Sequence, residues 1–395
     1  MTGMRCSLRS SLSLMALAAC GGGTQPIVPF ATRDSAGVEI VESGSALWDS
    51  APGWTVDSTP TLTIGKAEGD DPYLLSHVVD AFRRDDGSIV VLDGSSHQLR
   101  AFDSTGTFLV ARGRRGNGPG EFRYIEYASR CGRDAIWVQS GQRISVWGTD
   151  LAYRREFTFA DNMMWPLLCL DGTGLVVKED IRRIGEDPSD VIYDTSLQLR
   201  VLDSLGGARR DLLTMRLRSY INISAPKGGI GFPHPFGSQT QLGQDGDQLV
   251  VGEPHELSFR RYSDDGRLRR IVRGPLESFE LTSAMRNSYT SAKLIDRESI
   301  EIRTALATKD YPMPQRFPAY TALEVDRDGN TWVRRFEIPD TPARRWGVFR
   351  QDGRFLGHVT LPAGVQVLEI GSDYLLGLGK GPMDEEQVRM YRVRR

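Results

Sequence analysis

The residues that could hold a metal ion are few in this chain. Only five histidines occur among the 395 residues, and none belongs to an HxH or HExxH motif. His77, Asn162 and His234 are the candidate ligands, because each lies at the start of, or shortly before, a segment that reads as a strand. Calcium or zinc is the ion that such a set would hold, but without a carboxylate it makes a poor calcium site. We therefore expect no metal and no other cofactor.

Residues for covalent or acid–base catalysis form no known motif. The chain lacks the G-x-S-x-G elbow that presents a nucleophilic serine. The paired acids at 70–71 and 85–86 lie in turns, where aspartate is favoured for its local hydrogen bonds. No catalytic residue is assigned, and the sequence favours a binding protein over an enzyme.

The glycine-rich string from Gly113 to Phe122 does not fit a phosphate-binding loop. It lacks the GKS or GKT ending, and no helix follows whose N-terminus could face a phosphate. A structural role fits better, because glycine tolerates the positive φ values that a chain needs where it crosses from one sheet to the next. We expect Phe122 to fill the gap between two neighbouring sheets.

One strand pattern recurs six times, and these repeats must position any site. The copies are apolar strands, most of them followed by a turn that carries Gly or Asp. They lie at 99–103, 144–148, 199–203, 257–263, 346–350 and 388–392. Arranging four-stranded units around an axis hides the sheet edges of an all-β chain of this length. The sequence therefore predicts an all-β fold, a six-bladed β-propeller over residues 33–395.

The repeats also predict where the pattern is broken. The first blade has strands at 77–82, 89–92, 98–102 and 108–111, whereas a polar excursion over 179–190 interrupts the third blade. An insertion of about 275–318 separates blades four and five. Thr282 could cap a helix that begins at Ser283, so we expect a small helical insertion, with a disordered loop as the alternative.

The last blade ends one strand short at the C-terminus. Thr61 to Gly65 matches the outer strands of other blades and is predicted to supply the missing strand, so that the N-terminal strand closes the last blade. Such a closure also ties the two chain ends together. Val38 to Glu42 alternates like one further edge strand or hairpin.

A family resemblance supports this fold. The sequence Gly-Pro-Gly-Glu-Phe at 118–122, with Val-Leu-Asp at 91–93 and the strand at 98–103, resembles NHL-type repeats. The order of parts is similar to that of bacterial six-bladed β-propeller lipoproteins of the NHL and TolB-like group. The resemblance implies the fold but little about activity, because such propellers include binding proteins, scaffolds, lactonases and lyases.

The repeat predicts a ligand face at one mouth of the propeller channel. Metal-dependent propeller enzymes place carboxylate, Asn or His ligands there, whereas most positions aligned with His77 are aromatic or apolar. Core packing between blades is the alternative role for each of these side chains. The predicted face consists of His77, Tyr124, Trp165, His234, Phe236 and Tyr320.

These observations predict a non-enzymatic binding or protein-interaction module for a protein, peptide or glycan of the cell envelope. The alternative is a metal-dependent lactonase, hydrolase or lyase with its site at the channel mouth. The formal net charge of −2 argues against a nucleic-acid partner, and we expect a monomer.

The first nineteen residues read as an export signal. Arg5 and Arg9 are followed by a short apolar run that ends in Leu17-Ala18-Ala19-Cys20, which resembles the lipobox of bacterial lipoproteins. We expect a lipoprotein signal peptide at 1–19, lipidation of Cys20, and a flexible tether at 20–32. A plain secretory signal is the alternative. The lipid would hold the protein in the cell envelope, at the outer membrane or the periplasmic face.

Two cysteines remain after the leader and the lipidated residue are set aside. Cys131 and Cys169 each end the first strand of a repeat, and the two repeats are adjacent. In an oxidising compartment they can pair if their Cα atoms come within about 7 Å. Two buried free thiols are the alternative.

Overall fold

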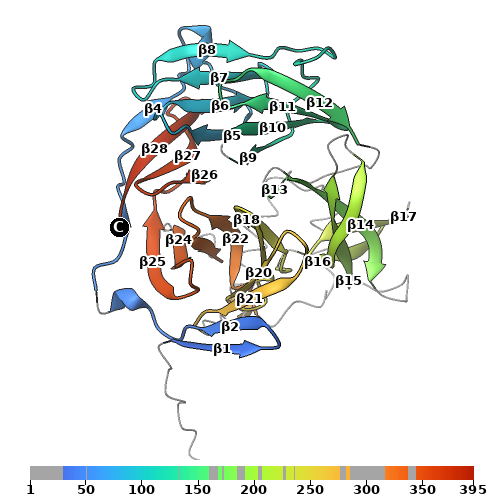
Figure 1. The fold of residues 1–395 in the computed structure, drawn as a ribbon. Helices are drawn as coiled ribbons and strands as arrows, with labels where there is room; N and C mark the ends of the chain where they lie inside the picture. Colours follow the sequence, from blue (N-terminus) through green and yellow to red (C-terminus); the bar gives the residue numbers. More distant parts are fainter. Residues whose placement is uncertain are drawn as a thin grey trace, which may run out of the picture.

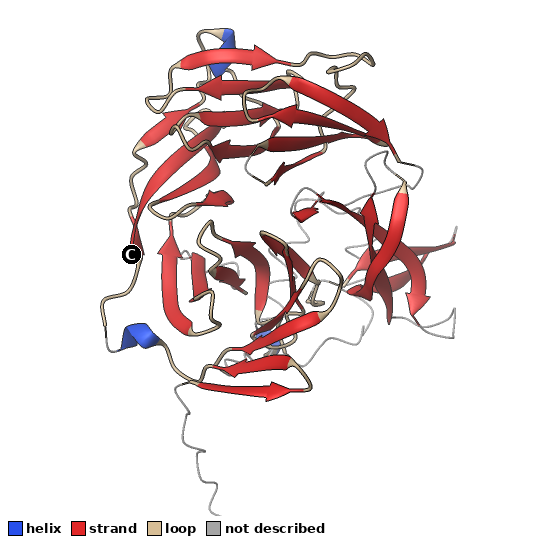
Figure 2. Ribbon diagram, viewed as in Figure 1, coloured by secondary structure: helices blue, strands red, loops and turns tan. Residues whose placement is uncertain are grey.

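The computed structural model describes residues 30–49, 51–132, 134–159, 168–170, 173–184, 192–202, 207–225, 228–234, 236–275, 282–284, 316–336 and 344–395. Strands dominate these residues, and the named helices are two short 3-10 turns, η1 (Leu47–Asp49) and η2 (Asp71–Tyr73) (Figure 2). No helix in the described ranges is long and apolar enough to cross a membrane.

The strands form six separate sheets around a common centre (Figure 1). Two sheets follow each other in the chain and keep the predicted four-strand order. The first contains β5 (Val78–Arg83), β6 (Ile89–Asp93), β7 (Gln98–Phe102) and β8 (Phe108–Arg112). The second contains β9 (Tyr127–Cys131), β10 (Ala135–Ser140), β11 (Arg143–Gly148) and β12 (Tyr153–Thr158).

Three further sheets keep the same order and complete the regular part of the molecule. One contains β18 (Gln241–Asp245), β19 (Gln248–Gly252), β20 (Ser258–Tyr262) and β21 (Leu268–Arg273). The next contains β22 (Tyr320–Val325), β23 (Thr331–Arg335), β24 (Arg344–Phe349) and β25 (Phe355–Leu361). The last contains β26 (Gln366–Ile370), β27 (Tyr374–Lys380) and β28 (Glu386–Arg394).

The third sheet in chain order departs from the repeat. It contains β13 (Leu168–Leu170), β14 (Thr173–Ile184), β15 (Ile192–Leu202), β16 (Ala208–Ala225) and β17 (Gly228–Pro233). The predicted polar excursion at 179–190 is therefore wrong up to Ile184, because β14 continues to that residue and pairs with β15. Polar residues did not break the strand, since the ladder is held by backbone groups whatever the side chains.

The first strands of the sheets surround the centre of a β-propeller. Contacts join β5 to β9, β9 to β13, β13 to β18 and β18 to β22 in chain order, and β26 contacts β5 across the two ends of the series. Five of the sheets form regular blades, so the predicted count of six blades is not confirmed; the β13–β17 sheet is irregular, and β13 is a shorter inner strand. The predicted helical insertion at about 275–318 lies almost wholly outside the described residues; in the part described only Ser283 and Ala284 are helical, and no further helical insertion is seen there.

The N-terminal strands belong to two different sheets. β4 (Leu62–Ile64) pairs with β28, which confirms the predicted closing strand, and β3 (Thr55–Val56) pairs with the end of the same strand. β1 (Ala31–Ser35) and β2 (Val38–Glu42) form the predicted hairpin, and β2 pairs in parallel with β21. The first two residues of β1, Ala31 and Thr32, lie within the segment that was predicted to be a flexible tether. Both η1 and β3 contact β25, so the N-terminal chain runs past three successive sheets.

Apolar side chains fill the spaces between neighbouring sheets. Phe122 is fully buried and packs with residues of the β5–β8 and β9–β12 sheets, its ring 5.7 Å from that of Trp147. This contact confirms the structural role expected for the glycine-rich string. At the string's start, Gly113 has φ of 85°, and a side chain there would meet the Phe122 ring at 2.6 Å.

Removing residues 388–395 should abolish cooperative folding, because β27, β3 and β4 would all lose their shared partner strand. The matched control is a chain that begins at Val38, which loses only the exposed β1. Circular dichroism during heating should show a sharp transition for the control and none for the C-terminal truncation. A truncated protein that melts within about 2 °C of the full chain would contradict the proposed dependence of the ring on β28.

Candidate functional site

A hollow opens at the end of the channel where the inner strands finish. Its volume is about 600 Å³, and a second hollow of about 330 Å³ continues inward along the strands. Both are lined by Arg130, Gln244, Glu324 and Glu369, so they are two parts of one channel. These four residues come from four different sheets. Any ligand in this channel would therefore contact several sheets at once.

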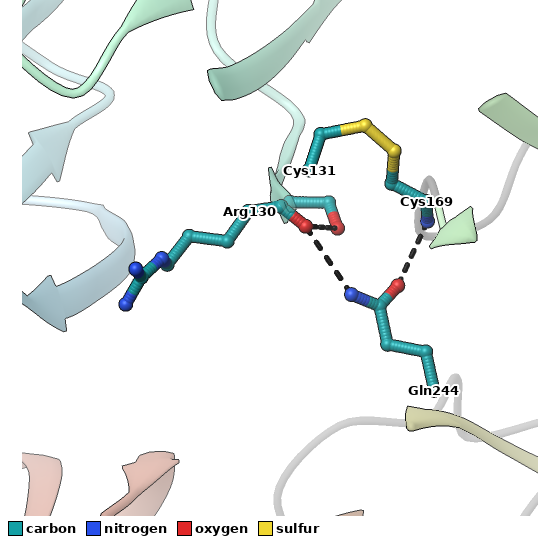
Figure 3. Close-up of a disulfide and its surroundings, with 5 residues drawn as sticks. Arg130, Cys131, Cys169 and Gln244 are labelled. Carbon is teal, nitrogen blue, oxygen red and sulfur yellow. Dashed lines mark hydrogen bonds between the residues drawn. A yellow bond between two sulfur atoms is a disulfide. The ribbon is translucent and has the colours of Figure 1, made fainter. Parts of the chain in front are cut away.

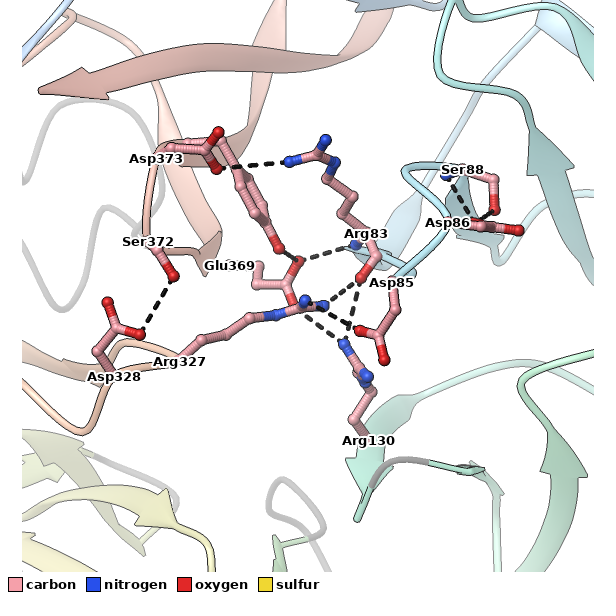
Figure 4. A network of polar contacts seen from close by, with 11 residues as sticks. Arg83, Asp85, Asp86, Ser88, Arg130, Arg327, Asp328, Glu369, Ser372 and Asp373 are labelled. Carbon is pink, nitrogen blue, oxygen red and sulfur yellow. Dashed lines mark hydrogen bonds and ion pairs between the residues drawn. The ribbon is translucent and has the colours of Figure 1, made fainter.

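Glu369, on β26, is the centre of a polar network at this mouth (Figure 4). Its Oε2 accepts hydrogen bonds from the Arg83 backbone N–H and the Tyr374 hydroxyl, each at 2.8 Å. Its Oε1 accepts from Arg327 Nε at 3.0 Å and from Arg130 Nη1 at 3.4 Å. The carboxylate thus receives donors from four elements: β5, β9, β27 and the turn after β22.

Two arginines of the network also bind one backbone oxygen. Arg130 Nη1 donates to the Arg83 carbonyl at 3.2 Å, and Arg327 donates to the same oxygen. Arg327 lies 3.6 Å from the exposed carboxylate of Asp85 as well. The Glu369 and Arg130 side chains are only 14% and 20% exposed, so their charges are partly removed from water. Removing one partner from such a set leaves a poorly solvated charge, which is costly.

Two further carboxylates in the channel, those of Asp80 and Glu324, form no ion pair with a described arginine. Burial, together with the charges of Glu369 and Glu324, raises the pKa of Asp80 to about 8, and one hydrogen bond from the Ala81 N–H opposes this shift. Burial raises the pKa of Glu324 to about 7, opposed by the charge of Arg334. Both groups therefore titrate near neutral pH. Such carboxylates can bind a cation when ionised, or exchange a proton with a bound molecule.

A disulfide joins Cys131 and Cys169 beside this mouth, with Cα atoms 5.1 Å apart (Figure 3). It links β9 to β13, the inner strands of adjacent sheets. Gln244 bridges the same two strands: its Oε1 accepts from the Cys169 N–H at 2.8 Å, and its Nε2 donates to the Arg130 carbonyl at 3.2 Å. The disulfide and the side-chain amide of Gln244 together fix the backbone that carries Arg130.

The predicted metal ligands do not form a described site. His77 lies at the start of β5 with φ of 56°, and its carbonyl accepts from the Gly94 N–H at 3.0 Å. His234 is buried, and its Nδ1 accepts from the Phe236 N–H at 3.3 Å. Asn162 lies outside the described residues. No group of three or more His, Cys, Asp or Glu residues that could hold a metal occurs in the described ranges.

Most described members of the predicted aromatic face pack into the interior. Tyr320 is fully buried and donates its hydroxyl to the Ser258 carbonyl at 2.6 Å. Phe236 is 1% exposed, with its ring 5.4 Å from that of Phe317. Tyr124 is 43% exposed, and Trp165 lies outside the described residues. Tyr320 and Phe236 therefore have the core-packing role that was the alternative. The described residues do not form a ligand face made of all six predicted side chains.

A second polar cluster contains a serine beside a histidine but lacks the geometry of a catalytic pair. Ser238 Oγ lies 3.2 Å from Nδ1 and 3.1 Å from Nε2 of His255, a position to which neither nitrogen's lone pair points. Arg216 donates to the same hydroxyl at 3.0 Å and pairs with Asp194 at 2.9 Å. The arginine and burial lower the pKa of His255. We read this cluster as structural.

Sequence reasoning missed the residues that line the mouth. Asp80, Glu324 and Glu369 are single acids within otherwise apolar inner strands, and Arg130 and Arg327 lie near the ends of theirs. A charged residue at this place in several repeats was the available signal. This signal is weak in the sequence, because the acids are isolated in separate strands and form no local motif.

Comparisons with known proteins give resemblances in shape only. No protein-family model and no curated protein matches the chain. Among solved structures, a "putative exported protein" from Bacteroides fragilis matches 90% of this chain and 99% of its own length, with 14% identity and a TM-score of 0.47. A member of the DUF4221 family from Bacteroides vulgatus matches 87% and 99%, with 12% identity and a TM-score of 0.49.

An enzyme is also among the similar structures. Virginiamycin B lyase from Staphylococcus aureus, an inactive variant solved with quinupristin, matches 87% of this chain and 94% of its own length. Its identity is 9% and its TM-score 0.38. At such values none of these proteins assigns a family or an activity, and the propeller arrangement rests on the sheets themselves.

Replacing Glu369 with Gln should lower the free energy of unfolding by about 2–4 kcal/mol, because Arg130 and Arg327 keep their charges and lose the counter-ion. Urea denaturation monitored by tryptophan fluorescence measures this. The control is Asp373→Asn, whose exposed carboxylate pairs with Arg83 at 3.5 Å and should matter by less than about 0.5 kcal/mol. Equal effects of the two substitutions would show that the network does not hold the mouth together.

Replacing both Cys131 and Cys169 with Ser should cost about 4 kcal/mol on the chain-entropy account of a loop of 38 residues. The measurement is urea denaturation of both proteins, with and without a reducing agent. The agent should lower the wild-type midpoint to that of the double variant and leave the variant unchanged. A wild-type midpoint already equal to that of the variant would argue against the cross-link.

Proposed function

We propose that this chain is an exported, lipid-anchored β-propeller that binds a polar ligand without transforming it, at the channel mouth where the inner strands end. The observation that carries the proposal is the hollow of about 600 Å³ with walls held by the Glu369 network. Its size lies within the usual range for ligand sites, and its polar groups are fixed before a ligand arrives. A peptide or glycan segment of an envelope partner is the proposed occupant.

The proposed fold is a ring of six blades of the NHL and TolB-like kind. Each of the six sheets would be one blade, with the irregular β13–β17 sheet as the third. Contacts between successive inner strands from β5 to β22, and between β26 and β5, support this count. So does β4, which gives the last sheet its outer strand.

Export and anchoring are proposed from the N-terminal sequence. Residues 1–29 lie outside the described residues, so the leader and the lipidation of Cys20 rest on the charged and apolar pattern and on the lipobox resemblance. The disulfide supports an oxidising compartment. Phe30 lies ten positions after Cys20, so the tether would span at most about 35 Å.

A second candidate function is a hydrolase or lyase at the same mouth. The observation that favours it is the pair Asp80 and Glu324, whose pKa values of about 8 and about 7 suit proton transfer at neutral pH. The metal-dependent form of this idea has less support, because the candidate ligands form no described site.

The binding proposal is tested by obstructing the mouth. Asp85 lies on its rim with an exposed side chain, so Asp85→Trp should narrow the entrance without removing core contacts. Glu68→Trp, on an exposed loop that lines neither hollow, is the control. Soluble wild-type and variant proteins beginning at Gly21 would be applied to arrays of envelope peptides and glycans, and affinities measured for the compounds bound.

We expect Asp85→Trp to weaken binding at least tenfold and Glu68→Trp to leave it unchanged. Ligands whose affinity does not respond to Asp85→Trp would place recognition elsewhere. Consumption of a bound compound by the wild type, seen by mass spectrometry and absent in Asp85→Trp, would favour the enzyme instead.

A further inference from the structure

Charge is distributed unevenly around the channel. Three neighbouring inner strands, β22, β26 and β5, each contribute one carboxylate: Glu324, Glu369 and Asp80. On the other side, β9 contributes Ser129 and Arg130 and β18 contributes Gln244. One half of the wall is therefore acidic, and the other half offers neutral polar groups and one arginine.

The available cations neutralise only one of the three acids. Arg130 and Arg327 are both bound to Glu369. Within the described residues Glu324 makes no hydrogen bond or ion pair, although its side chain lines both hollows, and Asp80 accepts a single hydrogen bond from the Ala81 N–H at 2.8 Å. Two carboxylates thus face the channel without a counter-ion.

Holding these two groups ionised is costly in the folded protein, as their raised pKa values show. Arg334, the remaining cation that acts on Glu324, donates its Nε to Thr321 Oγ1 at 2.9 Å. A positive group entering from solution would therefore meet two carboxylates, of which Asp80 has no ion pair among the described residues and Glu324 feels only the charge of Arg334.

Building on the proposed function, we propose that the channel recognises a compact organic cation, an alkylammonium group held between Asp80 and Glu324. An ammonium group donates three hydrogen bonds and is satisfied by two carboxylates and one neutral acceptor such as Gln244 or Ser129. A calcium ion instead takes six to eight oxygen ligands. The cation is carried by a lysine side chain of a peptide or by an amino sugar.

Calorimetry with defined probes tests this inference. The two probes at pH 7 are Nα-acetyl-lysine methylamide and glucosamine, which separate the two sources. Their neutral counterparts are the Nε-acetylated lysine derivative and N-acetylglucosamine. At least one amine should bind, and its acetylated counterpart should bind at least tenfold more weakly. Equal binding of amine and acetylated forms would overturn the proposal.

Asp80→Asn and Glu324→Gln should each weaken binding of that amine at least tenfold, and Glu68→Gln should have no effect. If the lysine probe binds, its affinity should also rise at least tenfold from pH 5.5 to 8.5, because both carboxylates ionise over that interval while the amine stays charged. Affinity independent of pH, or unaffected by both substitutions, would contradict an ammonium site.

Two measurements distinguish a failure of the ammonium proposal from unfolding of the variants and from a failure of the proposed function. A carboxylate whose folded pKa is raised destabilises the fold as pH rises from about 4 to about 8, so both variants should melt no lower than the wild type at pH 8.5. Loss of binding then does not reflect unfolding. Some ligands could have an affinity that is weakened by Asp85→Trp but not by Asp80→Asn or Glu324→Gln. That result would support the proposed function and contradict the ammonium site.

Discussion

The carboxylate of Glu369 is the contact on which the open end of the ring depends. Donors from β5, β9, β27 and the turn after β22 meet on its two oxygens. Without this one negative charge, the guanidinium groups of Arg130 and Arg327 would both remain on the Arg83 carbonyl, with the exposed carboxylate of Asp85 as their nearest counter-charge among the described residues. Both arginines are bound to this carboxylate, so within the described residues Asp80 and Glu324 have no ion pair with either of them.

A second set of contacts ties Arg395 to the turn after the inner strand β22, at the same end of the channel. Arg395 donates to the buried Asp326 at 2.7 Å and to the Gly371 carbonyl at 2.8 Å, and its guanidinium lies 4.3 Å from the centre of the Trp54 ring. Asp326 in turn accepts from the indole of Trp332 at 3.0 Å. The last residue of the chain is thus built into the turn after β22, which carries Arg327 to the mouth. Closure of the ring and geometry of the site are linked through that turn.

The sequence predicted the parts of this fold that depend on local pattern. Thr61 to Gly65 and Phe122 were placed correctly because a missing strand and an apolar residue after a glycine-rich crossing have few other roles. The extent of β14 was not predicted, since polar residues read as a loop unless their pairing partner is known. The mouth was missed for a related reason: Asp80, Glu324 and Glu369 lie 45 to 289 residues apart, and only the closed ring brings them together.

The parallel pairing of β2 with β21 determines how the ring would respond to mechanical force. A pull on the N-terminus reaches the β1–β2 hairpin before any other part of the described chain. The strands that close the ring, β3 and β4, lie beyond η1 and the tryptophans that pack along β25. Tension would therefore be borne first by a hairpin whose loss leaves the β18–β21 sheet with its four repeat strands. The pairing of β3 and β4 with β28 would carry force only after the hairpin has detached. A protein held by its N-terminus could therefore be pulled repeatedly without opening of its ring.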